Sequence, residues 1–186
     1  MIAAENALTF AKFRPAGYAN DDQLAAACRQ GDLRAFEQLY QVHGPRLKSV
    51  ALQMLGNRHD AEDAVQETFL KAYRGVKGFQ GQSNLGTWIC RILINTCYDT
   101  LRSRGPQAPA EEAEPAAKSP AMPLRLALQA ALRKLNPNYR IVFQLFEVEG
   151  YRHAEIASIL QVPEGTSKSW LFEAKRELKR MLAEAR

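Results

Sequence analysis

One segment divides this chain into two parts. Residues 104–123, RGPQAPAEEAEPAAKSPAMP, hold five prolines, three glutamates and many alanines, without any aromatic or β-branched residue. Such a segment buries too little apolar surface to offset the entropy lost on ordering, and its prolines keep it extended. Because a structureless stretch of this length is uncommon inside a compact domain, we expect a flexible linker between two domains rather than a surface loop within one.

Both sides of this linker carry a helical pattern. Apolar residues recur at three- and four-residue spacing, and no stretch alternates as a half-buried strand does. Capping and breaking residues predict helices that begin at Asp21, after Asp32, at Pro45, at Asp60 and at Thr87, then helices over 124–135, 139–149, 153–160 and 164–183. The expected fold is therefore all-α, with an extension over 1–20, a first domain over 21–103 and a second over 124–186.

Charge and cysteine content limit the classes of protein to which this chain can belong. The net charge of +5 mildly favours a polyanionic partner. Cys28, Cys90 and Cys97 form no CxxC pair, so we expect reduced, partly buried thiols in a cytoplasmic protein rather than a disulfide framework or a zinc site. Cys90 and Cys97 are two helical turns apart, which predicts that they share one helix face. No stretch reaches the roughly 18 apolar residues of a membrane span, and residues 1–20 lack the order of a secretory signal.

The end of the chain has the plan of a helix-turn-helix. Residues 153–178, HAEIASILQVPEGTSKSWLFEAKREL, read as a short helix, a tight turn and a longer helix. The second helix of such a motif enters the major groove by its first residues. The side chains there can donate to phosphates or base edges, and a basic strip follows them. The donors are Thr166, Ser167, Lys168 and Ser169, and the strip comprises Lys175, Arg176, Lys179 and Arg180.

The first domain carries two other signals. Residues 60–73, DAEDAVQETFLKAY, place Asp60, Asp63 and Glu67 early in a helix, where the helix dipole alone would favour them. An acidic face on a basic protein also suggests a basic protein partner. Residues 78–88 then form a loop of glycines, amides and hydroxyls before a helix with Trp88 and several arginines, an arrangement suited to single-stranded nucleic acid, although Phe79 and Trp88 also suit simple packing.

These pieces in this order resemble the extracytoplasmic-function (ECF) sigma factors of bacterial RNA polymerase. The matching stretches are DAEDAVQETFLKAY, FQGQSNLGTWICRILINTCYDTLR and LNPNYRIVFQLFEVEGYRHAEIASILQVPEGTSKSWLFEAKREL. The resemblance implies a sigma factor that binds core RNA polymerase, recognises the −10 and −35 promoter elements and promotes transcription initiation. It also implies an anti-sigma factor as a partner, and neither a catalytic residue nor a cofactor or metal.

The resemblance assigns residues to three surfaces. The contacts with the clamp helices of the polymerase's largest subunit are Asp60, Asp63, Gln66 and Glu67. The −10 contacts are Phe79, Gln80, Gln82, Ser83, Asn84, Arg91 and Asn95, with Trp88 mainly structural. The −35 contacts are Thr166, Ser167, Lys168, Ser169, Phe172, Lys175 and Arg176.

The chain departs from the usual family pattern at four positions. Gln80 and Gln82 replace a charged pair in the loop, while Trp170 and Glu173 stand where basic residues are frequent. These departures bear on which promoter sequence is read rather than on membership of the family. A glutamate near phosphates weakens binding and offers a contact to cytosine instead.

Two other classes of protein remain as alternatives. A conventional helix-turn-helix regulator explains the second domain but not the acidic helix followed by the polar loop. An enzyme such as a nuclease requires a cluster of metal or catalytic groups, whereas His43, His59 and His153 are scattered along the chain. Polymerase binding and promoter opening are expected of a sigma factor and of neither alternative, so they distinguish the three hypotheses.

Overall fold

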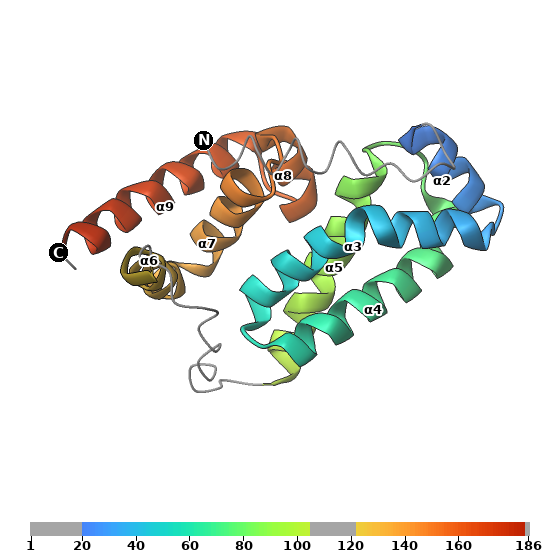
Figure 1. Ribbon diagram of the computed structural model, residues 1–186. Coiled ribbons are helices and arrows are strands. Elements are labelled where there is room, and N and C mark those ends of the chain that lie inside the picture. Colours follow the sequence, from blue (N-terminus) through green and yellow to red (C-terminus); the bar gives the residue numbers. More distant parts are fainter. Residues whose placement is uncertain (1–19, 105–121, 185–186) are drawn as a thin grey trace.

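The structure, a computed structural model, describes residues 20–104 and 122–184, which form helices joined by short turns (Figure 1). The N-terminal domain comprises α2 (Asp21–Arg29), α3 (Leu33–Leu55), α4 (Arg58–Gly75), the 3-10 turn η1 (Val76–Gly78) and α5 (Leu85–Ser103). The C-terminal domain comprises α6 (Met122–Lys134), α7 (Pro137–Phe143), the π-helical turn η2 (Gln144–Val148), α8 (His153–Leu160) and α9 (Glu164–Glu184). The predicted all-α fold is confirmed. Most of the predicted linker and N-terminal extension lies outside the described residues.

Asn and Asp side chains fix where several helices begin. Asn57 accepts a hydrogen bond from the backbone of Asp60, and Asn84 accepts one from the backbone of Thr87. Such caps satisfy backbone N–H groups that have no partner inside the helix. Because the caps are Asn57 and Asn84, each three residues before the predicted first residue, α4 and α5 each begin two residues earlier than predicted.

Pro45 does not begin a helix, contrary to the sequence prediction. It lies inside α3, which continues from Leu33 to Leu55. An internal proline removes one backbone hydrogen bond and is unfavourable by about 3 kcal/mol in a helix. The helix persists because both sides of the proline bury large side chains, including Leu39 before it and Leu47 and Val50 after it. Tertiary packing therefore outweighs the local signal.

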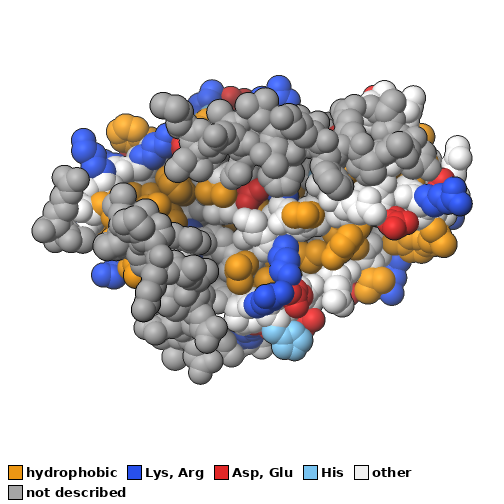
Figure 2. Space-filling model, viewed as in Figure 1, with side chains coloured by type: hydrophobic (Ala, Val, Ile, Leu, Met, Phe, Trp, Pro, Cys, Tyr) orange, Lys and Arg blue, Asp and Glu red, His pale blue; other side chains and the backbone are white. Residues whose placement is uncertain are grey.

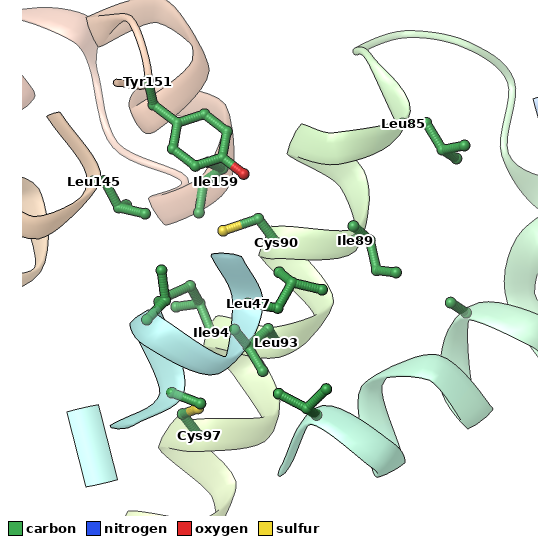
Figure 3. Close-up of a cluster of buried hydrophobic side chains, with 14 of the residues drawn as sticks. Leu47, Leu85, Ile89, Cys90, Leu93, Ile94, Cys97, Leu145, Tyr151 and Ile159 are labelled. Atoms are coloured by element: carbon green, nitrogen blue, oxygen red, sulfur yellow. The ribbon is translucent and has the colours of Figure 1, made fainter. Parts of the chain in front are cut away.

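Helix α5 lies at the centre of the N-terminal domain. It contacts α3 and α4, and its inward face includes Ile89, Cys90, Leu93, Ile94 and Cys97, each at most 1% exposed (Figure 3). Cys90 and Cys97 share one face of this helix, as predicted, and both are fully rather than partly buried. Burial raises the pKa of the Cys90 thiol to about 12. The opposite side of α5 is left free to carry polar side chains.

The C-terminal domain is held by two groups of contacts. Ala131 of α6 and Leu135, the residue after that helix, pack on Ala174 and Leu178 of α9. The helix-turn-helix pair α8 and α9 packs on α7 and η2. Its core is continuous with that of the N-terminal domain, because α8 lies against α5 and α3 contacts both α7 and η2. The two domains are thus packed together.

Candidate polymerase and nucleic-acid interfaces

Helix α4 presents one exposed face along its whole length. Asp63, Gln66, Leu70 and Tyr73 are exposed and follow each other at three- or four-residue spacing, and Glu67 beside them is half-exposed. The other side of the helix is buried against α3 and α5. Three of the four residues predicted to contact the polymerase therefore lie together on an accessible surface.

The two acidic groups on this face have only weak partners within α4. An Asp63 carboxylate oxygen lies 3.5 Å from Nδ1 of His59, and a Glu67 oxygen lies 3.8 Å from Nζ of Lys71. These are exposed pairs one helical turn apart, a class that contributes well under about 1 kcal/mol. Both carboxylates are therefore available to an external cation.

Asp60 is in a different setting. Its carboxylate forms an ion pair with Arg104 at the end of α5 and accepts a hydrogen bond from the side chain of Asn57. Both charged side chains of the pair are at most 25% exposed. In this arrangement Asp60 joins the start of α4 to the end of α5, which sets it apart from the three other predicted polymerase contacts.

Aromatic side chains extend the surface from α4 onto α3. The rings of Tyr40 and Phe69 lie 4.9 Å apart between centroids, and so do those of Phe36 and Tyr73. Hydrophobic side chains are visible over these helices on one face of the molecule (Figure 2). Exposed aromatic side chains are enriched at protein interfaces relative to the rest of the surface. Helical spacing alone predicts a buried stripe for Phe69 and Tyr73, whereas Tyr73 is 50% exposed.

The loop over residues 79–84 is anchored at its first residue. Phe79 is 8% exposed, its ring lies 5.1 Å from that of Trp88, and its carbonyl accepts a hydrogen bond from Arg29. Gln80 and Gln82 that follow are exposed, and Ser83 is half-exposed. The structure thus gives Phe79 and Trp88 a packing role and leaves the amides free to contact a ligand.

Three of the predicted −10 residues lie along one side of α5 and its cap. Asn84, Arg91 and Asn95 are separated by seven and four positions, a spacing that places them on one helix face. Asn95 is exposed and Arg91 half-exposed. The side-chain amide of Asn84 donates to a carboxylate oxygen of Glu155 in α8 at 2.6 Å. The helix-turn-helix therefore touches this predicted DNA-reading face.

The helix-turn-helix has the predicted arrangement, with one residue placed differently from expectation. Gln161 ends α8 in the left-handed conformation at φ 56°, and α9 begins at Glu164. Ser167 is fully buried, and its hydroxyl lies 2.9 Å from Nδ1 of His153. Because this pair fixes the angle between α8 and α9, the Ser167 side chain does not face outward with its neighbours.

The remaining predicted −35 residues lie on the outer surface of α9. Lys168, Ser169, Phe172, Lys175 and Arg176 are exposed, and Thr166 is half-exposed. Phe172 is 64% exposed, which is unusual for an aromatic side chain in a folded domain. The exposed strip therefore combines cations, hydroxyls and one apolar ring, the chemistry required to contact phosphates and thymine methyl groups.

Each cation among the predicted −35 contacts lies beside an acidic side chain. The pairs are Lys168 with Glu164 at 2.7 Å, Lys175 with Glu147 at 2.6 Å, and Arg176 with Glu173. Lys168 accordingly holds the pKa of Glu164 below its usual range. The departure from the family pattern at Glu173 thus has a structural consequence, because it partly neutralises a predicted phosphate contact.

Other kinds of site are not seen among the described residues. Within residues 20–104 and 122–184, His, Cys, Asp and Glu form no group of three or more able to hold a metal ion. The same residues include no helix that is both long and apolar enough to cross a membrane.

Comparison with known proteins identifies the two domains separately. Residues 39–107 match the family described as Sigma-70 region 2, and residues 125–178 match Sigma-70, region 4. The chain is 36% identical over 166 residues to the ECF RNA polymerase sigma factor SigM of Mycobacterium tuberculosis, covering 88% of this chain and 85% of that protein. It is 32% identical to the RNA polymerase sigma-H factor of Pseudomonas aeruginosa, covering 87% of this chain and 93% of that protein.

Solved structures agree with the sequence comparisons. CnrH, in complex with the cytosolic domain of CnrY, superposes with a TM-score of 0.71 at 27% identity, covering 88% of this chain and 97% of CnrH. The sigma factor RpoE of Bartonella quintana, in complex with the anti-sigma factor NepR, superposes with a TM-score of 0.68 at 26% identity, covering 82% of this chain and 99% of RpoE. Both likenesses extend over the two helical domains. The chain therefore belongs to the ECF sigma factors, the non-enzymatic subunits that direct bacterial RNA polymerase to promoters.

Proposed function

We propose that this sigma factor acts in the cytoplasm through three separate surfaces. The exposed face of α4 binds core RNA polymerase, the 79–84 loop with α5 reads the −10 element, and α9 reads the −35 element. The observation that carries the proposal is that one chain presents three surfaces of different chemistry: acidic and aromatic, amide-rich, and basic. The domains proposed for these tasks are residues 21–103 and 124–186.

Single-round transcription tests this function directly. The purified chain is mixed with core RNA polymerase and a library of genomic fragments, and run-off transcripts are sequenced. We expect transcripts that depend on the chain and begin downstream of a shared two-element sequence. Duplex binding without polymerase and without promoter-dependent transcripts would instead identify a conventional helix-turn-helix regulator.

We assign −10 reading to the amide and hydroxyl side chains of the loop and the following helix. Gln80, Gln82 and Ser83 offer both donors and acceptors to an unpaired base, and Asn95 extends the same surface along α5. Arg91 supplies a cation for the phosphates. Phe79 is assigned the supporting role of holding the loop on Trp88, at a ring distance of 5.1 Å.

Replacing Lys168 by alanine is expected to weaken promoter binding by about tenfold, because an exposed cation at the start of α9 contacts phosphate or a base edge. The measurement is the affinity of the reconstituted holoenzyme for a promoter found in the transcription experiment. Lys134→Ala removes an exposed lysine from α6 and serves as the control. Equal loss of affinity for core polymerase in Lys168→Ala would contradict a role confined to DNA.

Replacing Glu173 by glutamine is expected to strengthen promoter binding by about threefold, because it frees Arg176 from its acidic neighbour. The salt dependence should also steepen, by up to about 0.9 in the slope of log affinity against log salt, since one more cation displaces counterions. Titrations at several salt concentrations measure both effects. Glu177→Gln on the same helix is the matched control, and an unchanged slope in Glu173→Gln would count against phosphate contact by Arg176.

We propose an anti-sigma factor as the inhibitory partner of this chain. The support is the likeness to RpoE of Bartonella quintana, which was crystallised with the anti-sigma factor NepR. A pull-down with tagged protein from the source cells, followed by mass spectrometry, should recover both polymerase subunits and a second, small protein. Recovery of polymerase subunits alone would remove this part of the proposal.

A further inference from the structure

His153, the first residue of α8, lies between two other elements of the C-terminal domain. Its Nδ1 is 2.9 Å from the hydroxyl of Ser167 in α9, and its ring stacks on that of Phe146 in η2, with 4.5 Å between ring centroids. Ser167 is fully buried, and so is Leu145 next to Phe146. Because both partners are themselves fixed by packing, the imidazole is held in one position.

The second ring nitrogen of His153 is accessible. Among the described residues, Nε2 of His153 has no hydrogen-bond partner, and unlike Nε2 of His43 it is not buried away from solvent. A charged ring carries a proton on both nitrogens, and a neutral ring carries one on Nε2 when the Ser167 hydroxyl donates to Nδ1. With Nδ1 bound to Ser167, His153 can therefore donate an N–H from Nε2 to a ligand.

The Ser167 hydroxyl allows His153 to change its charge without losing their contact. A hydroxyl is both donor and acceptor, so it donates to Nδ1 of a neutral ring and accepts from the Nδ1–H of a charged one. Phe146 also suits the charged form, because the face of an aromatic ring attracts a cation. Protonation therefore adds a positive charge at a fixed place, and the angle between α8 and α9 is retained.

The charges that act on His153 come from α9. Loss of hydration lowers the pKa of His153 most; Lys168 and Lys175 lower it further, and Glu164 opposes them. Other charged or polar groups on η2, on α8 and on α5, which also packs on α8, are Glu147, Arg152, Glu155 and Asn84. Each of these four groups has a polar partner within the chain. In the free chain the ring is therefore mostly neutral at neutral pH.

Promoter DNA changes this balance. Lys168 and Lys175 are proposed −35 contacts, so phosphates bound by them bring negative charge close to His153. The first helix of a helix-turn-helix also crosses the DNA backbone, which places phosphates by α8. A phosphate oxygen that accepts from Nε2–H binds more strongly when the ring is charged. The pKa of His153 is consequently higher in the complex than in the free chain.

We infer that His153 is a phosphate contact of the −35 reader that takes up a proton on promoter binding, so that affinity rises as pH falls. Because these phosphates are the ones met by α9, the coupling rests on the proposed function of that helix. Affinity is highest below the pKa of His153 in the free chain, and the gain is lost as pH rises through its pKa in the complex. A single proton limits the change to about tenfold per pH unit.

Promoter affinity of the preassembled holoenzyme, measured from about pH 5.5 to about pH 8, tests this coupling. Relative to His153→Gln, the wild type should gain about fivefold in affinity between the alkaline and the acidic end. Glutamine keeps a side-chain N–H donor and never gains a charge. The ratio of the two affinities at each pH cancels the titration of polymerase and of the other histidines. His59→Gln, which replaces an exposed histidine on α4, should keep the wild-type pH dependence.

His153→Lys separates charge from a structural role. Lysine stays charged over this whole range, so the variant should bind at about pH 8 as tightly as the wild type does at about pH 5.5. Equal pH dependence in the wild type and His153→Gln would overturn the inference. So would a loss of affinity by the same factor in both variants at every pH, since that result would mean packing alone. Absence of promoter binding by the wild type at any pH would instead remove the proposed function, and this coupling with it.

Discussion

Reversing the charge of Asp63 and Glu67 together to lysine is expected to weaken binding to core RNA polymerase by about a hundredfold. Both carboxylates are accessible on α4, and their partners within the helix are 3.5 and 3.8 Å away. Two reversals place repulsion where two attractions were, and losses of this size are typical of close charge pairs at interfaces. Surface-immobilised core enzyme titrated with each variant measures the effect.

The control for this prediction comes from the same domain. Asp22 and Asp99 are exposed acids on α2 and α5, away from the aromatic surface of α3 and α4, and their joint reversal changes the net charge equally. We expect the control to bind core polymerase within about twofold of the wild type, since long-range attraction is screened at physiological salt. Similar losses in both double variants would show that net charge, and not the face of α4, governs the association.

Replacing Leu93 by alanine is expected to lower the stability of the N-terminal domain by about 3 kcal/mol. Leu93 is fully buried at the centre of α5, so the change leaves a cavity as well as removing apolar contact. In a domain of this size the melting temperature should fall by more than about 10 °C. Thermal and urea unfolding, followed by circular dichroism, measure the loss.

Leu101 gives the matched comparison on the same helix. It is 38% exposed, so Leu101→Ala removes the same atoms without creating a buried cavity. The expected destabilisation is about 0.5 kcal/mol. Equal effects of the two substitutions would mean that α5 is not the central packing element of the domain. Helix α5 also carries Asn95, a proposed −10 contact, which unfolding would displace. The Leu93 variant should therefore lose promoter activity near its melting temperature and retain it well below that temperature.

The helices could be predicted from the sequence where local chemistry determines them. Asp32 and Gly56 mark the start and the end of α3, and the whole of α8 is bounded as expected. Pro45 misled the prediction, because the burial of Leu39 before it and Leu47 after it outweighs a missing hydrogen bond. Local signals thus suffice for helix ends, but not where tertiary packing opposes them.

The candidate surfaces were predictable only in part, for a similar reason. Spacing along one helix indicates which residues share a face, and the acidic residues of α4 and the cations of α9 do lie on exposed faces, while the polymerase and DNA contacts assigned to them stay predictions. Spacing does not indicate which single position in a strip turns inward, as Ser167 does toward His153. The contact between Arg46 of α3 and Glu149 of the C-terminal domain could not be predicted, because these residues are far apart in the sequence and belong to no motif.

The ion pair between Asp60 and Arg104 fixes the point at which the chain leaves the N-terminal domain. Covalent geometry then limits the reach of residues 105–121 to about 60 Å. Under the proposed function, the second domain must find its promoter element within that distance of Arg104 once the first domain is seated on polymerase and DNA. The length of this segment, rather than any contact by α9, then sets the longest spacing between the two promoter elements that one chain can bridge.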